Sequence, residues 1–188
     1  MDERSVFYRE WLPLPKAEFN ILAMLAEQGG SFSGNYSDMC RYLGVTPQDR
    51  NRRTIREAIE NLSANGWINH ASSGRTQLLS IVPKATEISL PRRWVQSVIR
   101  HDYSSVPVAF AVVLKVFIWI VDNQQDVITN LMIAQSVGVS VSTVVHAKNV
   151  LLNEYENITK AKVSEKLGDE FFRTIGQRLA AGAWWKDP

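Results

Sequence analysis

Two eight-residue stretches of this chain, DMCRYLGV at residues 38–45 and MIAQSVGV at residues 132–139, align with each other and end in the same Gly-Val. After each copy come a polar stretch and positions of matching character, which are Thr54, Ile55, Ala58 and Leu62 in the first half and Thr143, Val144, Ala147 and Leu151 in the second. Internal similarity of this kind indicates a repeated structural unit. The sequence therefore predicts two similar domains, over residues 1–83 and 84–188.

The residues around the first copy predict three helices. Apolar residues from Phe19 to Ala26 recur at helical spacing, and Gly29-Gly30 ends the segment. We expect Ser37 to cap a short second helix that runs through Leu43. Gly44 follows, where glycine adopts a left-handed turn at the least cost. A longer third helix is expected over residues 50–63.

A β-hairpin is predicted after the third helix. Residues 67–70 and 77–82 have strand character and flank Ser73-Gly74, which has the composition of a tight turn. The order helix, helix, glycine turn, helix and hairpin is that of a winged helix-turn-helix domain.

The second half predicts a similar order of elements. Pro91 opens a short helix over residues 92–100. Residues 108–122 form a helix that is apolar nearly all round, so neighbouring elements must cover every face of it. We assign it to the core, with a homodimer or partner interface as the alternative.

The elements around the second copy are predicted from their caps. We expect Thr129 to cap one helix, Gly138 to form the turn, and Ser140 or Ser142 to cap a last helix that ends at Tyr155. Residues 158–166 and 170–180 are predicted to form a second wing, and a helix over residues 169–183 is the alternative.

Residues 36–45, 53–62 and 65–68 together resemble the helix-turn-helix domains of plasmid and phage replication initiators and related mobile-element regulators. Residues 128–144 are similar to the same signature. The resemblance implies a mainly α protein with small β wings, organised as two winged helix-turn-helix domains in tandem. It also implies that double-stranded DNA is the partner.

Composition and sequence pattern predict a folded protein that neither spans a membrane nor is secreted. The chain has 188 residues, 45% hydrophobic residues and a net charge of +2, which fits a folded protein with a sizeable core. The apolar stretch at residues 108–121 contains Lys115 and is too short to cross a bilayer, so we expect no membrane. The polar N-terminus and the single cysteine, Cys40, predict a cytoplasmic protein without a secretory signal.

The titratable residues do not predict an enzyme. His70, His101 and His146 are far apart without metal-ligand spacing, and Cys40 has no CxxC partner. The chain also lacks the glycine-rich phosphate-binding motifs and the nucleophile elbow. We therefore predict no catalytic residue, metal site or cofactor, and we interpret Cys40 as a buried apolar thiol.

The strongest candidate site is a group of four arginines, Arg50, Arg52, Arg53 and Arg56, at the start of the predicted third helix. Guanidinium groups bind phosphate and guanine edges in pairs, and a helix N-terminus favours phosphate. The alternative is that these side chains pair with Glu57 and Glu60, for example as Arg56–Glu60. Gln48 is a further candidate for contact with DNA.

The other candidate contacts lie on the last helix and the wings. Ser140, Ser142, Thr143, His146 and Lys148 form a polar side that suits phosphate contacts, although the two serines are also candidate helix caps. The wing candidates are Arg75 at the first tip and Lys160, Lys162 and Arg173 in the second wing. Charged groups of this kind are also common on solvated faces.

These features predict a non-enzymatic protein of a mobile element that binds double-stranded DNA with two recognition helices, as a replication initiator or a transcriptional regulator. The alternative is a winged-helix protein that binds a protein or nucleoprotein complex, such as a phage-encoded inhibitor of the anti-CRISPR type. A fold by itself does not distinguish these functions.

Overall fold

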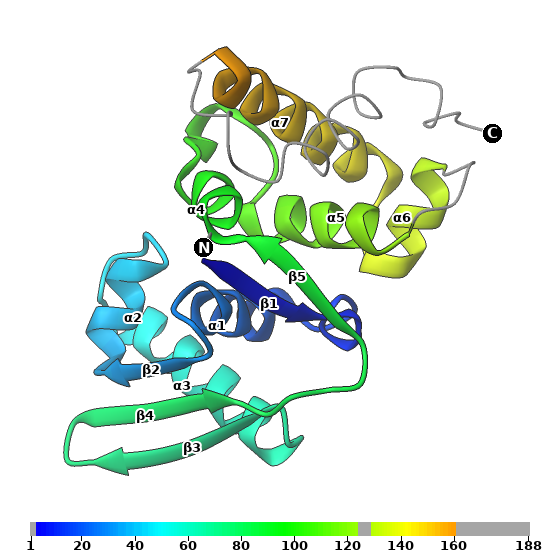
Figure 1. Cartoon of the computed structure of the whole chain (residues 1–188). Helices are drawn as coiled ribbons and strands as arrows, with labels where there is room; N and C mark the ends of the chain where they lie inside the picture. The colour runs from blue at the N-terminus through cyan, green and yellow to red at the C-terminus, as the bar shows by residue number, and fades with distance from the viewer. Residues whose placement is uncertain (1–2, 124–128, 161–188) are drawn as a thin grey trace. The chain divides into compact units, whose positions relative to one another are not determined.

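The computed structural model describes residues 3–123 and 129–160. These residues belong to two compact units. The N-terminal unit comprises Arg4–Ser89, and the C-terminal unit starts at Leu90 and takes in Glu3. Within the described residues the chain is mainly helical, with two small sheets (Figure 1).

The N-terminal unit contains strands and helices in mixed order. In chain order they are β1 (Arg4–Tyr8), a 3-10 turn (Arg9–Trp11), α1 (Lys16–Glu27), β2 (Ser31–Gly34), α2 (Tyr36–Tyr42), α3 (Asp49–Ala64), β3 (Ile68–Ser73), β4 (Thr76–Ile81) and most of β5 (Glu87–Pro91). The last two residues of β5, Leu90 and Pro91, belong to the C-terminal unit. The three predicted helices and the predicted hairpin are confirmed. The sequence did not predict β1, β2 or β5.

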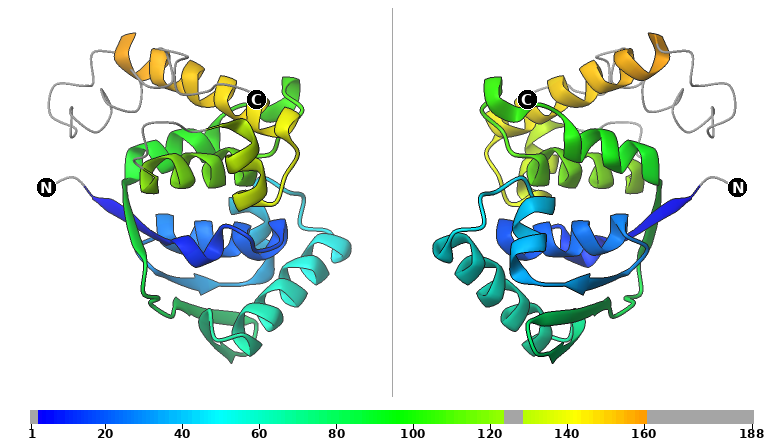
Figure 2. Two further views of the ribbon diagram at one scale, coloured as in Figure 1. Left: turned by 90° about the vertical axis from the view of Figure 1, so that its right-hand side faces the viewer. Right: turned by 90° about the vertical axis from the view of Figure 1, so that its left-hand side faces the viewer.

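The core of the N-terminal unit forms around α1, which contacts α3 and strands of both sheets (Figure 2). The predicted apolar positions of α1, from Phe19 to Ala26, are buried, as are Ile55, Ile59 and Leu62 of α3. The three-stranded sheet is antiparallel with the order β2-β4-β3. Leu79 of β4 lies between Phe32 and His70 in this sheet, and its side chain is part of the buried core.

The boundary between the units falls after Ser89, whereas the repeat predicts it after residue 83. The reason is a two-stranded sheet formed by β1 and β5. Arg4 supports this pairing, since its Nε donates to Ser89 Oγ at 2.6 Å and its Nη2 donates to the Ser89 carbonyl at 2.8 Å. The pairing joins segments that are far apart in sequence, so local patterns do not reveal it.

Apart from Leu90 and Pro91 at the end of β5, the regular elements of the C-terminal unit are helices within the described residues. Its elements are α4 (Arg92–Arg100), a 3-10 turn (Tyr103–Ser105), α5 (Phe110–Asp122), α6 (Asn130–Val137) and α7 (Val141–Lys160). Helix α5 contacts α4, α6 and α7, and every residue from Val113 to Ile120 is buried. Trp94 of α4 stacks on Phe117 with ring centroids 5.6 Å apart. The assignment of this apolar helix to the core is confirmed.

The two predicted glycine turns are confirmed and have the same local geometry. Gly44 has φ 69° and Gly138 has φ 72°. In the first turn the Val45 N–H donates to the Cys40 carbonyl at 2.9 Å, and in the second the Val139 N–H donates to the Ala134 carbonyl at 3.0 Å. These donors and acceptors occupy aligned positions of the repeated pattern. Such bonds satisfy carbonyl groups that a helix end would otherwise leave unpaired.

The helix caps correct one prediction and decide another. Ser37 does not cap α2, because the helix starts at Tyr36 and the cap is Asn35, two residues earlier than predicted. Asn35 Oδ1 accepts from the Ser37 and Asp38 amides at 2.8 and 3.0 Å, and the Asp38 carboxylate accepts from the Asn35 amide, which completes a capping box. Thr129 caps α6 as predicted, and Ser140, not Ser142, caps α7 through the Thr143 amide at 3.2 Å.

The predicted second wing is wrong at its start. Helix α7 continues to Lys160, so residues 158–160 are helical where a strand was expected. Helix formation is cooperative, so the backbone hydrogen bonds of α7 continue past Tyr155 once the helix has started at its Ser140 cap. The remainder of the predicted wing and the alternative helix over residues 169–183 lie outside the described residues. No helix in the described part of the chain has both the length and the apolar character required to span a membrane.

Candidate nucleic-acid interface

Helix α3 separates apolar and basic residues onto different sides. Ile55, Ala58, Ile59 and Leu62 are buried. The arginines that face away from them form what we call the basic face, which comprises Arg50, Arg53 and Arg56, all exposed, and the half-buried Arg52. Helical periodicity produces this separation, because residues three or four positions apart share a side of the helix. The basic face occupies the N-terminal half of α3.

Two arginines of the basic face pair with carboxylates of the same helix. Arg52 Nη1 lies 2.9 Å from Asp49 Oδ1, and Arg53 Nε lies 2.8 Å from Glu57 Oε1. The hydrogen bond to Glu57 raises the pKa of Arg53. Its guanidinium, like that of any arginine, is charged at neutral pH. Exposed ion pairs contribute little to stability, so a phosphate can replace these carboxylates at small cost.

Arg56 contacts Tyr36, whereas the alternative interpretation paired it with Glu60. Its guanidinium carbon lies 5.3 Å from the centroid of the Tyr36 ring, at the first residue of α2. Stacking on an aromatic ring leaves the guanidinium N–H groups free to donate to other acceptors. Arg52 also contacts α2, since its Nε donates to Ser37 Oγ at 3.1 Å. The basic face is therefore held against α2.

Tyr36 also links α2 to the hairpin. Its hydroxyl donates to Gln77 Oε1 at 3.3 Å, and His70 Nε2 lies 2.8 Å from the same oxygen. Gln77 is on β4 and is buried, with 5% of its surface exposed. His70 is on β3, in agreement with its interpretation as a strand residue of the hairpin. Sequence reasoning missed the roles of Tyr36 and Gln77, because only the folded chain brings them together.

Gln48 and Arg75 lie at two exposed positions of the N-terminal unit. Gln48 precedes the first residue of α3 and makes no side-chain capping hydrogen bond. Asn51 anchors the loop before α3, as its Nδ2 donates to the Thr46 carbonyl at 2.8 Å. Arg75 follows Gly74, whose φ of 60° forms the tight turn of the hairpin. Both side chains are open to solvent.

The start of α7 carries neutral hydroxyl groups instead of arginines. Ser140 Oγ lies 3.0 Å from Ser142 Oγ and 2.7 Å from Thr143 Oγ1. His146 is exposed on the same helix. Lys148 has a structural contact, since its Nζ donates to Asn130 Oδ1 of α6 at 2.8 Å. The predicted polar side therefore exists, but its lysine connects two helices.

The predicted cations of the second wing are not brought together by the described structure. Lys160 is the last residue of helix α7, so its prediction as a wing residue is wrong. Lys162 and Arg173 lie outside the described residues.

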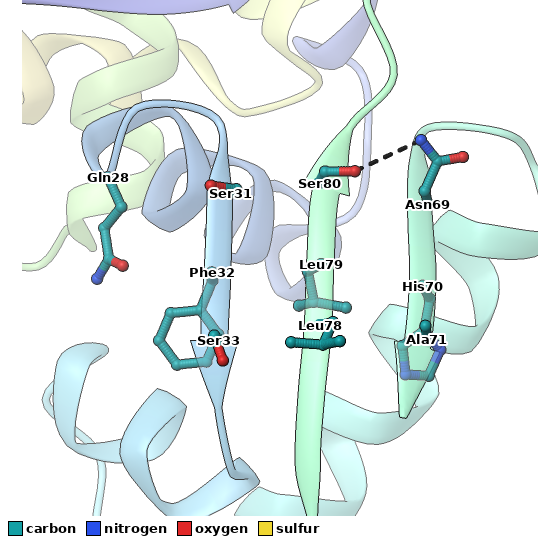
Figure 3. A pocket seen from close by; sticks show the side chains of 10 residues that line it. All are labelled: Gln28, Ser31, Phe32, Ser33, Asn69, His70, Ala71, Leu78, Leu79 and Ser80. Atoms are coloured by element: carbon teal, nitrogen blue, oxygen red, sulfur yellow. Dashed lines mark hydrogen bonds between the residues drawn. The ribbon is translucent and has the colours of Figure 1, made fainter. Parts of the chain in front are cut away.

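A hollow of about 460 Å³ lies against the three-stranded sheet (Figure 3). It is lined by Gln28, Ser31, Phe32, Ser33, Asn69, His70, Ala71, Leu78, Leu79 and Ser80. Ser31, Ser80 and Asn69 are neighbours across the three strands, and Asn69 Nδ2 donates to Ser80 Oγ at 3.4 Å. Sequence reasoning missed this hollow because β2 was not predicted. Its lining contains no lysine or arginine, so it is a poor match for phosphate.

The described residues contain no group of three or more His, Cys, Asp and Glu side chains that could hold a metal ion. Cys40 is buried within α2, and burial raises the pKa of its thiol. A buried thiol with a raised pKa is a poor nucleophile. Its interpretation as a buried apolar residue is confirmed.

The chain matches no protein-family model, no curated protein and no solved structure.

Proposed function

We propose that this chain is a non-enzymatic protein that binds double-stranded DNA through its N-terminal unit. We interpret that unit as a winged helix-turn-helix, in which α2 and α3 form the helix-turn-helix and β3 and β4 form the wing. The order α1-β2-α2-α3-β3-β4 and the sheet order β2-β4-β3 support this interpretation. Helices α6 and α7 form the second helix-turn-helix in our proposal, because their turn repeats that of α2 and α3.

The basic face is the observation that carries the proposal. Its three exposed arginines lie in the N-terminal half of α3, whereas Glu57 and Glu60 lie toward the other end. In helix-turn-helix proteins the N-terminal residues of the recognition helix contact base edges in the major groove. Arginine suits this position, since its fork matches both phosphate oxygens and the O6 and N7 atoms of guanine. Arg75 would contact the sugar–phosphate backbone from the wing.

We propose a smaller role in DNA binding for α7. Ser142, Thr143 and His146 are suited to hydrogen bonds with phosphate, but they bring little positive charge. DNA affinity would then depend mainly on the N-terminal unit. The biological setting that the sequence resemblance supports is a replication initiator or regulator of a mobile element.

Salt dependence of DNA binding tests the proposal. We expect the native chain to bind mixed-sequence duplex DNA at low ionic strength, with an affinity that falls steeply as salt rises. The triple variant Arg50→Ala, Arg53→Ala and Arg56→Ala should flatten the plot of log K against log salt by about 0.9 for each phosphate that the protein no longer neutralises. Arg52 is left in place because it bonds to Ser37.

A matched control removes the same charge elsewhere. Lys16, Arg41 and Arg93 are exposed and lie on α1, α2 and α4. The triple alanine variant at these positions should keep the native slope. The proposal fails if the native chain does not bind duplex DNA at low salt, or if the two triple variants change the slope equally.

A second candidate function is the binding of a protein or nucleoprotein partner. The observation in its favour is the surface of α6 and α7, where Leu131 is 42% exposed and Val141 is 37% exposed. Exposed apolar side chains are typical of protein interfaces when they form a patch. Under this function the native chain would not bind duplex DNA in the salt titration, and Leu131→Ser would weaken binding to the partner.

A further inference from the structure

Gln77 is a buried polar residue on strand β4 of the hairpin. Only 5% of its surface is exposed. Burial of an amide is costly unless its donors and acceptors find partners. Gln77 has such partners, since its Oε1 faces Tyr36 and His70, and its Nε2 donates to the Arg75 carbonyl at 3.4 Å. The amide is therefore satisfied within the N-terminal unit.

The orientation of this amide is determined by its partners. The Arg75 carbonyl only accepts hydrogen bonds, so the Gln77 nitrogen must face it. Gln77 Oε1 then accepts from the Tyr36 hydroxyl at 3.3 Å and from His70 Nε2 at 2.8 Å. Both distances are consistent with one oxygen that accepts two donors. This requires His70 to carry a proton on Nε2.

These contacts form a continuous path between two candidate DNA-binding groups. At one end, Gln77 holds the backbone of Arg75 at the tip of the hairpin. At the other end, Tyr36 supports the guanidinium of Arg56, 5.3 Å from its ring centroid. Gln77 and Tyr36 are joined by the hydrogen bond between them. The path therefore joins the hairpin, α2 and α3.

An apolar side chain at this buried position should cost little stability. Methionine has a similar length and an apolar side chain, and it would avoid the cost of burying polar atoms. Tyr36 and His70 are both partly exposed, so water can satisfy their polar atoms if the amide is absent. A satisfied polar network does, however, fix the geometry of the groups that it joins.

We propose that Gln77 is a positioning residue that couples the wing contact of Arg75 to the helix contact of Arg56, so that the two groups bind DNA cooperatively. This inference rests on the proposed DNA-binding function. In the native chain, DNA that binds the Arg75 side chain also fixes the hairpin tip whose carbonyl bonds to Gln77, and Gln77 in turn fixes Tyr36 beneath Arg56. Loss of either arginine's contact with DNA therefore weakens the contact of the other.

A double-mutant cycle measures this coupling. The probe is a mixed-sequence duplex of about 30 base pairs, or three helical turns. Its affinity is measured for the native chain, Arg56→Ala, Arg75→Ala and the double variant, and the four measurements are repeated in a Gln77→Met background. In the native background the double variant should lose less affinity than the product of the single losses, by a factor of about three or more. In the Gln77→Met background this factor should be close to one.

Two controls separate positioning from a general structural effect. Arg50 lies on the same helix and takes no part in the path, so its cycle with Arg75 should give a factor close to one in both backgrounds. Gln77→Met should change the melting temperature by less than about 4 °C. Tyr36→Phe is a second variant, because it removes the hydroxyl and keeps the ring beneath Arg56, and it should abolish the coupling as well.

The possible failures can be distinguished. If the native chain binds the duplex, and each arginine variant weakens binding but the native coupling factor is close to one, the role of Gln77 is overturned and DNA binding stands. An equal coupling factor in the native and Gln77→Met backgrounds has the same meaning. Absence of duplex binding by the native chain overturns the proposed function and the coupling together.

Discussion

The α2–α3 and α6–α7 segments have similar turns but different surfaces. In both, a glycine with φ near 70° ends the first helix, and the following valine donates to an aligned carbonyl group. The aligned residues Cys40 and Ala134 are both buried. The outer side of α3 carries four arginines, whereas the start of α7 carries Ser140, Ser142 and Thr143. Turn geometry thus depends on glycine and on buried apolar residues, and the exposed residues can differ without affecting it.

The two segments also differ in how their second helix begins. Ser140 caps α7 by accepting from the Thr143 amide at 3.2 Å. Gln48 occupies the same position at α3 and makes no capping hydrogen bond through its side chain. The first-turn amides of α3 are therefore open to an external acceptor, which is consistent with the arginines beside them. At α7 a side chain of the protein has already taken one of these amides.

The largest expected change in stability comes from substitution of the buried leucines that the two segments share. Leu62 and Leu151 occupy aligned positions, and both are fully buried. Leu62→Ala and Leu151→Ala should each reduce the free energy of unfolding by about 2–5 kcal/mol, because each leaves a cavity in a packed core. Urea denaturation followed by circular dichroism measures this loss.

Methionine at the same positions is the control. Leu62→Met and Leu151→Met conserve volume and should cost less than about 1.5 kcal/mol. A loss below about 1 kcal/mol for only one of the alanine variants would show that the two leucines do not have equivalent roles in their cores.

The sequence was most informative where short-range patterns govern structure. Helical spacing and glycine predicted α1, α3, α4 and both turns, since these features depend on neighbouring residues. Pairing of β1 with β5 depends on segments at opposite ends of the N-terminal unit, so local patterns could not predict it. At the second wing, Gly168-Asp169 suggested the turn of a hairpin that begins at residue 158, but α7 continues through residue 160.

The candidate site was predictable only in part. The number and position of the arginines on α3 followed directly from the sequence. The partners of these arginines could not be predicted in the same way. Arg56 on α3 contacts Tyr36 on α2, and Tyr36 bonds to Gln77 on the hairpin. The i, i+4 spacing suited Arg53–Glu57 as well as Arg56–Glu60, and the folded chain pairs the first of these. Helix geometry allows both ion pairs, and tertiary contacts decide which of them forms.

The second prediction concerns a difference between the apolar helices of the two units. Helix α5 contains the buried Lys115, whereas the buried residues of α1 from Phe19 to Ala26 are all apolar. Burial lowers the pKa of Lys115 from 10.5 to about 8. Between these two values the unfolded chain binds a proton that the folded chain has released, so stability should rise with pH. Below pH 8 both states are protonated, and the cost of the buried charge is fully present.

Lys115→Met should remove this pH dependence and raise stability at pH 7. The gain should be about 2 kcal/mol once screening by solvent is taken into account. Urea denaturation at several pH values from 7 to 10.5 measures both effects. Lys84→Met is the matched control, because Lys84 is partly exposed above the Trp67 ring. Equal pH profiles for the native chain and Lys115→Met would contradict the prediction.

The smallest expected effect tests the difference in helix caps. Ser140→Ala removes a capping hydrogen bond and should reduce the free energy of unfolding by about 1 kcal/mol, whereas Gln48→Ala should leave it nearly unchanged. Gln48→Ser would supply α3 with the cap that α7 already has, so it should increase stability by a few tenths of a kcal/mol or more. Under the proposed function Gln48→Ser should weaken duplex binding more than Gln48→Ala does, because the serine hydroxyl would also occupy a first-turn amide of α3. Increased stability with the same DNA affinity as Gln48→Ala would mean that the amide bonded by the serine does not contact DNA.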